Sequence, residues 1–379
     1  MGPLEGLRIV ELAGIGPGPF CAMVLADLGA DVVRVDRLTG AGGDPGAARF
    51  DILGRGRRSV AVDLKAPGGA EVVLRLVDRA DALLEGFRPG VAERLGVGPQ
   101  VCLARNPRLV YGRMTGWGQE GPLAQTAGHD ITYAAVAGAL AHIGRVDQLP
   151  TPPLNLVADF GGGGMLLALG LVSALLHAQR AGEGQVVDAA MVDGTALLMS
   201  PFFGASAMGY WSDQRGTNLL DSGAPFYDVY RCADGLELAV GAIEPQFFAS
   251  LLDLLGLSVA SVPDQNDQTR WPELRSILAS TIARRPRAEW VERAEGTDAC
   301  VAPVLTMREA QHHPHLVARN AIVERDGVPQ PAPAPRFSAT PAELGAPPAV
   351  PGQHTDEVLA DWGFTPDELE ALHTDGVVA

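Results

Sequence analysis

Alternating apolar runs and helical stretches in the first third of the chain constrain the fold more than any other feature. Apolar runs rich in valine and leucine lie at 7–12, 31–36, 59–64, 81–87 and 108–114. Helix-forming stretches at 20–29 and 70–80 and a glycine-rich loop at 38–51 connect several of them. Strands joined through helices run parallel and are covered by helices. The pattern therefore predicts an α/β fold with a parallel, helix-covered sheet.

The second half of the chain has a different pattern. After helices predicted at 129–141, 160–179 and 191–208, the segments YDVYR and LELAVGA flank the turn CADG, in which Asp-Gly is typical of a β-hairpin. Helices near 245–256, 272–284 and 286–294 and a strand in VAPVL follow. A chain of 379 residues is longer than a single hydrophobic core usually accommodates, so we expect two domains. We predict a large domain at 1–200 completed by 330–379, a linker at 201–224, a small α+β domain at 225–320, and a proline-rich linker at 321–352 that runs extended.

Charge excludes one class of partner and suggests another. The formal net charge is −16, which disfavours a nucleic-acid surface. Basic residues nevertheless gather before residue 115, in the run RGRR (Arg55, Arg57, Arg58) and at Lys65, Arg88 and Arg94. A local basic cluster in an acidic protein favours a small polyanionic ligand.

Cysteine spacing and the N-terminus bear on metal binding and location. The four cysteines match no zinc or redox spacing, so we predict no metal site. The N-terminus MGPLEGLRIVEL lacks the basic start and long apolar core of a signal peptide, and we expect a cytoplasmic protein. The uncharged stretch 160–179 is long enough to span a membrane, but four glycines, Ser173 and His177 interrupt it. We interpret it as a buried helix behind a glycine loop, and expect no membrane association.

The loop GIGPGPF after the first strand resembles a dinucleotide-binding loop, but its spacing differs. The glycines at 14, 16 and 18 give GxGxG instead of GxGxxG. Pro17 and Pro19 also remove backbone N–H groups that a pyrophosphate needs as donors. A tight strand-to-helix turn, with a proline at the start of the helix, is the favoured interpretation.

Three ionisable residues stand at helix starts among apolar or small residues. His129 opens a helix in AGHDITY, Asp159 precedes four glycines in NLVADFGGGGM, and Glu244 follows the hairpin in AVGAIEPQF. Each has a structural alternative: a hydrogen-bonded histidine, or an acidic helix cap. Glycines disfavour helix and permit close approach of a ligand or another backbone. Together, a carboxylate beside such a gap and a histidine at another helix start could form an acid–base pair.

Long segments over almost the whole chain carry a family resemblance. They include GPGPFCAMVLADLGADVVRVDR, LLEGFRPGVAERLG, MTGWGQEGP, AGHDITY, PLNLVADFGGGGM and AVGAIEPQF. These segments resemble the α-methylacyl-CoA racemases, a branch of the family III CoA-transferase (CaiB/BaiF-type) superfamily. The resemblance implies a Rossmann-like large domain and a smaller domain in an interlocked homodimer.

The resemblance also implies a reaction. The enzyme would interconvert (2R)- and (2S)-2-methylacyl-CoA thioesters by 1,1-proton transfer through an enolate, without a cofactor. His129 and Asp159 would exchange protons with the two faces of the α-carbon. Glu244 of a partner subunit would hydrogen-bond His129, and the backbone N–H of Asp130 would stabilise the enolate oxygen.

By motif match, the resemblance assigns coenzyme A binding to several segments. Thr132 departs from the asparagine usual in the motif, and the loop 38–51 leaves the placement of Arg37 open. Methionines such as Met165, Met191 and Met199 could contact the acyl chain or pack in the core. The assigned residues are Arg37, Val62, Asp63, Leu64, Lys65, Arg88, Arg94, Gly128, His129, Asp130, Ile131, Thr132 and Tyr133.

Three other functions remain open from the sequence. In a family III CoA-transferase, Asp159 would be the nucleophile and no histidine base would be needed, so the AGHD motif favours racemisation. The other two are a nicotinamide-dependent oxidoreductase and a CoA-binding regulatory protein without catalysis.

Overall fold

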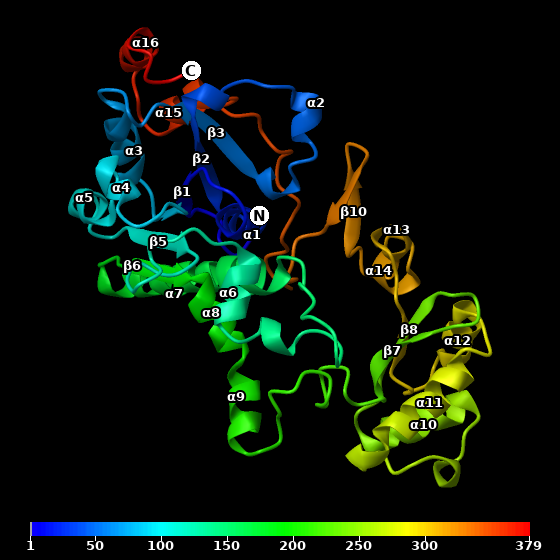
Figure 1. Cartoon of the computed structure of the whole chain (residues 1–379). Helices are drawn as coiled ribbons and strands as arrows, with labels where there is room; N and C mark the ends of the chain where they lie inside the picture. Colours follow the sequence, from blue (N-terminus) through cyan, green and yellow to red (C-terminus); the bar gives the residue numbers. More distant parts are fainter. Residues whose placement is uncertain (1) are drawn as a thin grey trace. The chain divides into compact units, whose positions relative to one another are not determined.

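The computed structural model describes residues 2–379, which form two compact units (Figure 1). Unit 1 contains the chain up to Ala137, Leu154–Met199 and Val317–Ala379. Unit 2 contains Gly138–Pro153 and Ser200–Leu316. The domain and linker bounds expected from the sequence remain predictions.

Unit 1 is built on a six-stranded parallel sheet, which confirms the predicted α/β class. The strand order is β3-β2-β1-β4-β5-β6, so the order reverses between β1 and β4. Five strands lie close to the predicted segments. The sixth was missed, because VVDAA is a short edge strand without an apolar alternation. The strands are β1 (Arg8–Leu12), β2 (Asp31–Arg37), β3 (Arg57–Val62), β4 (Ala82–Glu85), β5 (Val110–Thr115) and β6 (Val186–Ala190).

Helices cover the sheet of unit 1 on both faces, and its central strands β1 and β4 are buried except at Arg8. One core joins alternate residues of β1, β2 and β3 to α3 and to α15, the helix before the last one. As predicted, the turn after β1 leads into a helix with a proline at its start, but the helix begins at Pro17, three residues before the predicted stretch 20–29. The helices are α1 (Pro17–Asp27), α2 (Pro45–Ala48), α3 (Gly69–Val77), α4 (Val91–Arg94), α5 (Pro99–Arg105), α6 (Asp130–Val136), α7 (Leu166–Ala181), α8 (Met191–Leu198), α15 (Thr355–Asp361) and α16 (Pro366–Thr374).

The helix predicted at 160–179 is longer and less regular than expected. A π-helix, Leu156–Met165, contains the glycine run, and α7 continues from it. α7 packs on β5, where a Cβ on Gly112 would lie 2.9 Å from Cδ2 of Leu171. The opposite side of α7 is exposed, since Leu169 on that side is 64% exposed. By length and composition, Leu156–Ala181 could cross a membrane. The prediction of a buried helix is therefore correct for one side only.

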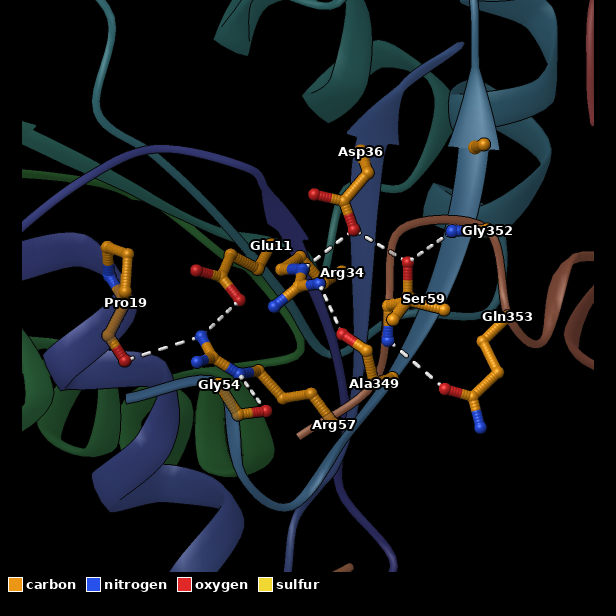
Figure 2. A network of polar contacts seen from close by, with 12 residues as sticks. Glu11, Pro19, Arg34, Asp36, Gly54, Arg57, Ser59, Ala349, Gly352 and Gln353 are labelled. Carbon is orange, nitrogen blue, oxygen red and sulfur yellow. Dashed lines mark hydrogen bonds and ion pairs between the residues drawn. The ribbon is translucent and has the colours of Figure 1, made fainter. Parts of the chain in front are cut away.

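The C-terminal segment is more structured than the predicted extended linker. Strands β10 (Ile322–Arg325) and β11 (Val328–Pro331) form an antiparallel hairpin. Farther on, Arg34 of β2 donates to the carbonyl of Ala349 at 3.1 Å, and the N–H of Gly352 donates to Oγ of Ser59 at 2.8 Å (Figure 2). These hydrogen bonds attach the end of the chain to the first sheet strands.

Unit 2 is a small α+β unit. Its antiparallel sheet has the order β7-β8-β9, and the predicted hairpin forms its first two strands. Phe226, Trp271 and Trp290 lie in its core. α14 continues from unit 2 into unit 1. The elements are α9 (Ser200–Ala207), β7 (Tyr227–Arg231), β8 (Glu237–Gly241), α10 (Pro245–Leu255), α11 (Trp271–Ile282), α12 (Arg287–Ala294), β9 (Val301–Pro303), α13 (Met307–Ala310) and α14 (Pro314–Ala318).

Candidate active site

A cavity of about 440 Å³ lies in unit 1 where the strand order reverses. The loops that follow β1 and β4, residues 14–19 and 86–89, form two of its walls. Residues 114–117 at the end of β5 and residues 126–129 before α6 form others. In open parallel sheets, the crevice at such a reversal is the usual ligand site. The fold alone therefore points to this cavity.

His129 lies at the N-cap of α6 and lines this cavity. The hydroxyl of Thr132 accepts the backbone N–H of His129 at 3.0 Å and donates to the carbonyl of His129 at 2.7 Å. The residue that departs from the family motif thus fixes the backbone of the predicted base. The imidazole of His129 is exposed at the cavity wall.

Asp159 lines the same cavity, from the π-helix. Burial raises the pKa of its carboxyl group, as does the charge of Asp130, whereas a 3.3 Å hydrogen bond from Nδ2 of Asn155 and the charge of His129 lower that pKa. A raised pKa favours the neutral acid, and a carboxyl group can give a proton in that form and take one as the carboxylate. The structure thus brings together His129 and Asp159, which sequence reasoning had paired.

Asp130 has a structural role that sequence reasoning missed. Its buried Oδ1 accepts the backbone N–H groups of Ala158 at 2.8 Å and Asp159 at 2.7 Å. N–H groups in the first turn of a helix lack intrahelical acceptors, so this carboxylate caps the π-helix. No sequence signal could have found this bond, because the two segments are 28 residues apart.

The glycine run after Asp159 is explained by neighbouring backbone. A Cβ on Gly164 would lie 2.8 Å from the backbone carbonyl oxygen of Pro17, and one on Gly162 would lie 2.7 Å from the backbone N of Thr195. Helices α1 and α8 therefore approach the π-helix more closely than any side chain would allow. Of the two explanations offered by the sequence, close backbone approach is the one the structure supports.

The residues assigned to coenzyme A by resemblance fall into two groups. Arg88, Gly128, His129 and Tyr133 line the cavity. The others lie at or just after the carboxyl ends of β2 and β3, or on the helices α4 and α6. In this second group are Arg37, Val62, Asp63, Leu64, Lys65, Arg94, Asp130, Ile131 and Thr132.

The basic cluster predicted from the sequence is only partly a surface feature. Arg55 is buried and bonded through Nε to Asp27 at 3.0 Å. Arg57 is buried and paired with Glu11 at 2.6 Å. The interpretation of RGRR as part of an anion site is wrong for these two arginines, whose charges are used inside the protein. Arg37, Lys65, Arg88 and Arg94 remain exposed.

Glu244 belongs to unit 2, where it is the exposed N-cap residue of α10. Its predicted bond to His129 therefore stays a prediction. Within residues 2–379, no group of three or more histidine, cysteine, aspartate or glutamate side chains could hold a metal ion.

Several cavity residues were not singled out from the sequence. Phe87 lies on the loop after β4, Met114 lies near the end of β5, and Trp117 follows that strand. The ring of Trp117 meets that of Tyr133 edge-on, with centroids 4.8 Å apart. The motif MTGWGQEGP contains Met114 and Trp117, but these residue types do not by themselves indicate a chemical role.

Comparison with known proteins gives consistent results. The model of CoA-transferase family III matches residues 4–355. The α-methylacyl-CoA racemase of Mus musculus is 50% identical over 378 residues, covering 99% of this chain and 97% of that protein. The human racemase is 48% identical over 382 residues, with the same coverage. The crystal structure of a CaiB/BaiF family protein from Brucella suis is similar with a TM-score of 0.81, at 27% identity, covering 95% of this chain and 99% of that one.

Proposed function

Because this chain belongs to CoA-transferase family III, we propose that it is an α-methylacyl-CoA racemase, interconverting (2R)- and (2S)-2-methylacyl-CoA thioesters. One observation carries the proposal: His129 and Asp159, from two different elements, line a single cavity. A 1,1-proton transfer requires two such groups, one for each face of the α-carbon.

In this reaction the neutral imidazole of His129 removes the α-proton of one enantiomer. The C–H electron pair moves into the thioester and forms an enolate, and the carboxylic acid of Asp159 protonates the opposite face. For the other enantiomer, the Asp159 carboxylate removes the proton and the His129 imidazolium returns one. The backbone N–H of Asp130, at the first position of α6, would donate to the enolate oxygen. Burial of Asp159 supports this scheme, because it stabilises the neutral acid.

The coenzyme A portion of the substrate would follow the carboxyl ends of the strands. Arg88 is exposed at the cavity, and Arg37, Lys65 and Arg94 are exposed near the ends of β2, β3 and β4. Guanidinium and ammonium groups there would pair with phosphates.

We also propose that the active enzyme is a homodimer in which Glu244 of one subunit supports His129 of the other. Large apolar side chains on the π-helix, α7 and α8 favour burial against a second copy. They include Leu156 (56% exposed), Leu169 (64%) and Leu197 (60%). Exposed apolar surface of this kind marks protein–protein interfaces.

CoA transfer between carboxylic acids is the second candidate, since the family includes it by name. There the carboxylate of Asp159 would attack the thioester, and a base on the opposite face would have no part. The position of His129 on the same cavity favours racemisation.

Deuterium incorporation at the α-carbon separates the two reactions. We expect each 2-methylacyl-CoA enantiomer to exchange its α-proton in heavy water without an acceptor acid. His129→Ala and Asp159→Ala should each lower racemisation by about 10²–10⁴-fold, the usual value of a positioned acid or base. CoA transfer to a free carboxylic acid without α-exchange, or near-native racemisation in both variants, would overturn the proposal.

A further inference from the structure

A fully buried ion pair lies beneath one wall of the cavity. Nη1 of Arg57 donates to Oε2 of Glu11 at 2.6 Å, and both side chains are at most 1% exposed (Figure 2). Oε1 of Glu11 has no hydrogen-bond partner among residues 2–379. Buried ion pairs are often no more stabilising than apolar residues of similar volume. Stability alone therefore does not account for this pair.

Arg57 also anchors the segment that leads into α1. The same Nη1 donates to the carbonyl of Pro19 at 3.3 Å, and Nε donates to the carbonyl of Gly54 at 3.4 Å (Figure 2). Pro19 lies in the first turn of α1, next to the loop that lines the cavity. The guanidinium therefore connects β1, β3 and the start of α1.

The anchored loop has open space on both sides. Gly14, Ile15, Gly16 and Pro19 line the 440 Å³ cavity and also a second cavity of about 610 Å³, which Arg57 itself borders. The side chain of Ile15 is 85% exposed, and a Cβ on Gly14 would meet no atom of the described chain within 4 Å. Since few packing contacts hold residues 14–16, the hydrogen bond at Pro19 helps to fix where this loop joins α1.

Close contacts connect this loop and the start of α1 to the segment that contains Asp159. A Cβ on Gly16 would lie 3.5 Å from Oδ2 of Asp159. The ring of Phe20 packs against that of Phe160, with centroids 4.6 Å apart. A Cβ on Gly164 would lie 2.8 Å from the carbonyl oxygen of Pro17. A shift of the start of α1 would therefore displace the π-helix that carries Asp159.

His129 is held differently, by its own hydrogen bonds to Thr132 at the start of α6. We propose that Glu11 and Arg57 are positioning residues that set the place of Asp159, and not of His129, in the cavity. This inference rests on the proposed racemase function.

The test uses double replacement of the pair, Glu11→Met with Arg57→Met, which leaves no unpaired buried charge. α-Proton exchange in heavy water is measured separately from each enantiomer of a 2-methylacyl-CoA. Asp159→Asn first identifies the enantiomer whose proton Asp159 removes. We expect exchange of that enantiomer to fall about 10–100-fold in the double variant, because misplacement of a catalytic group by 1 Å can cost about 100-fold. Exchange of the other enantiomer should stay within about 3-fold of the unmodified enzyme, since His129 is not displaced.

A second buried ion pair provides a matched control. Arg55 and Asp27 are at most 4% exposed, and Arg55 also bonds Gln330 and Pro331. Asp27→Met with Arg55→Met should change exchange of both enantiomers equally or not at all. If the double variant does not fold, the same exchange measurement is made on Arg57→Lys, which keeps a positive charge opposite Glu11. Equal losses for both enantiomers, or no loss, in a folded Arg57 variant would overturn the inference. Absence of exchange in the unmodified enzyme would instead refute the proposed function.

Discussion

Oδ1 of Asp130 accepts the backbone N–H of Asp159 at 2.7 Å. Since Asp130 directly follows His129, two adjacent residues govern both proposed acid–base groups: one supplies the imidazole and the other holds the segment with the carboxyl group. The carboxylate of Asp130 is thus one of the groups that set the relative placement of His129 and Asp159. Its Oδ2 has no partner within residues 2–379, and its charge raises the pKa of Asp159.

Replacement of Asp130 by asparagine should lower the pKa of Asp159. The amide oxygen can still accept both backbone N–H groups, but the charge that raises this pKa is lost. Asp159 must be ionised to remove a proton, so exchange of its enantiomer falls as the pH drops through its pKa. The acid limb of that profile should therefore move to lower pH, measured as α-exchange rates between pH 4 and 9.

Asn155→Ala should have the opposite effect on the same profile. The hydrogen bond from Asn155 lowers the pKa of Asp159, so its removal should raise that pKa and move the acid limb to higher pH. Shifts of the two variants in the same direction would contradict this account of the carboxyl group.

Subunits with different defects should complement each other if Glu244 acts across a dimer. His129→Ala and Glu244→Ala homodimers should both have low racemase activity. In a mixed dimer, one site carries both replacements and the other carries neither. Coexpression should therefore restore about a quarter of the unmodified activity, for random pairing of subunits. Activity that stays at the level of the two homodimers would place Glu244 in the same chain as its His129, or outside the site.

Glu85 should make the protein less stable as the pH rises towards neutral. It is buried at the end of β4, and burial raises its pKa from 4.5 to about 7 although the N–H of Phe87 and the charge of Arg113 lower it. Between these pH values the native state binds more protons than the unfolded chain, so the free energy of unfolding falls as the pH rises. Across the whole interval from pH 4.5 to about pH 7, the free energy of unfolding should fall by about 3 kcal/mol.

Urea unfolding at pH 5 and pH 7.5 checks this prediction. Relative to Glu85→Gln, the unmodified protein should lose stability between the two pH values. If the unmodified protein instead gained stability relative to Glu85→Gln between pH 5 and pH 7.5, or kept the same relative stability, the assignment would be contradicted.

Gly164→Ala should destabilise unit 1, because its Cβ would lie 2.7 Å from Cδ1 of Phe20 and 2.8 Å from the carbonyl oxygen of Pro17. Overpacking of this kind costs about 1–3 kcal/mol. Gly18→Ala is the matched control, since its Cβ would meet no described atom within 4 Å and should change stability by less than about 0.5 kcal/mol. Urea unfolding of both variants gives the comparison, and equal effects would show that the close approach of α1 to Gly164 is not tight.

Much of the fold followed from local patterns. The first strands are buried on both faces, and such strands consist of nearly continuous valine, isoleucine and leucine, so segments such as 7–12 and 31–36 could be recognised directly. The helix start at Pro17 was also predictable, because proline fits the first turn of a helix. By contrast, VVDAA was missed at the sheet edge, and the apolar stretch 160–179 did not reveal its π-helical start.

The candidate site shows the same division between what the sequence predicts and what chain packing determines. The sequence by itself determined the parallel sheet and the residue types that can move a proton, His129 and Asp159, because both depend on local pattern and side-chain chemistry. Only the tertiary structure decided that these two share a cavity, that Asp130 caps the segment of Asp159, and that Arg55 and Arg57 are buried in ion pairs. The physical reason is that a charge has the same sequence signature whether it faces water or a buried partner. Contacts between residues 28 or 46 positions apart exist only once the chain has packed.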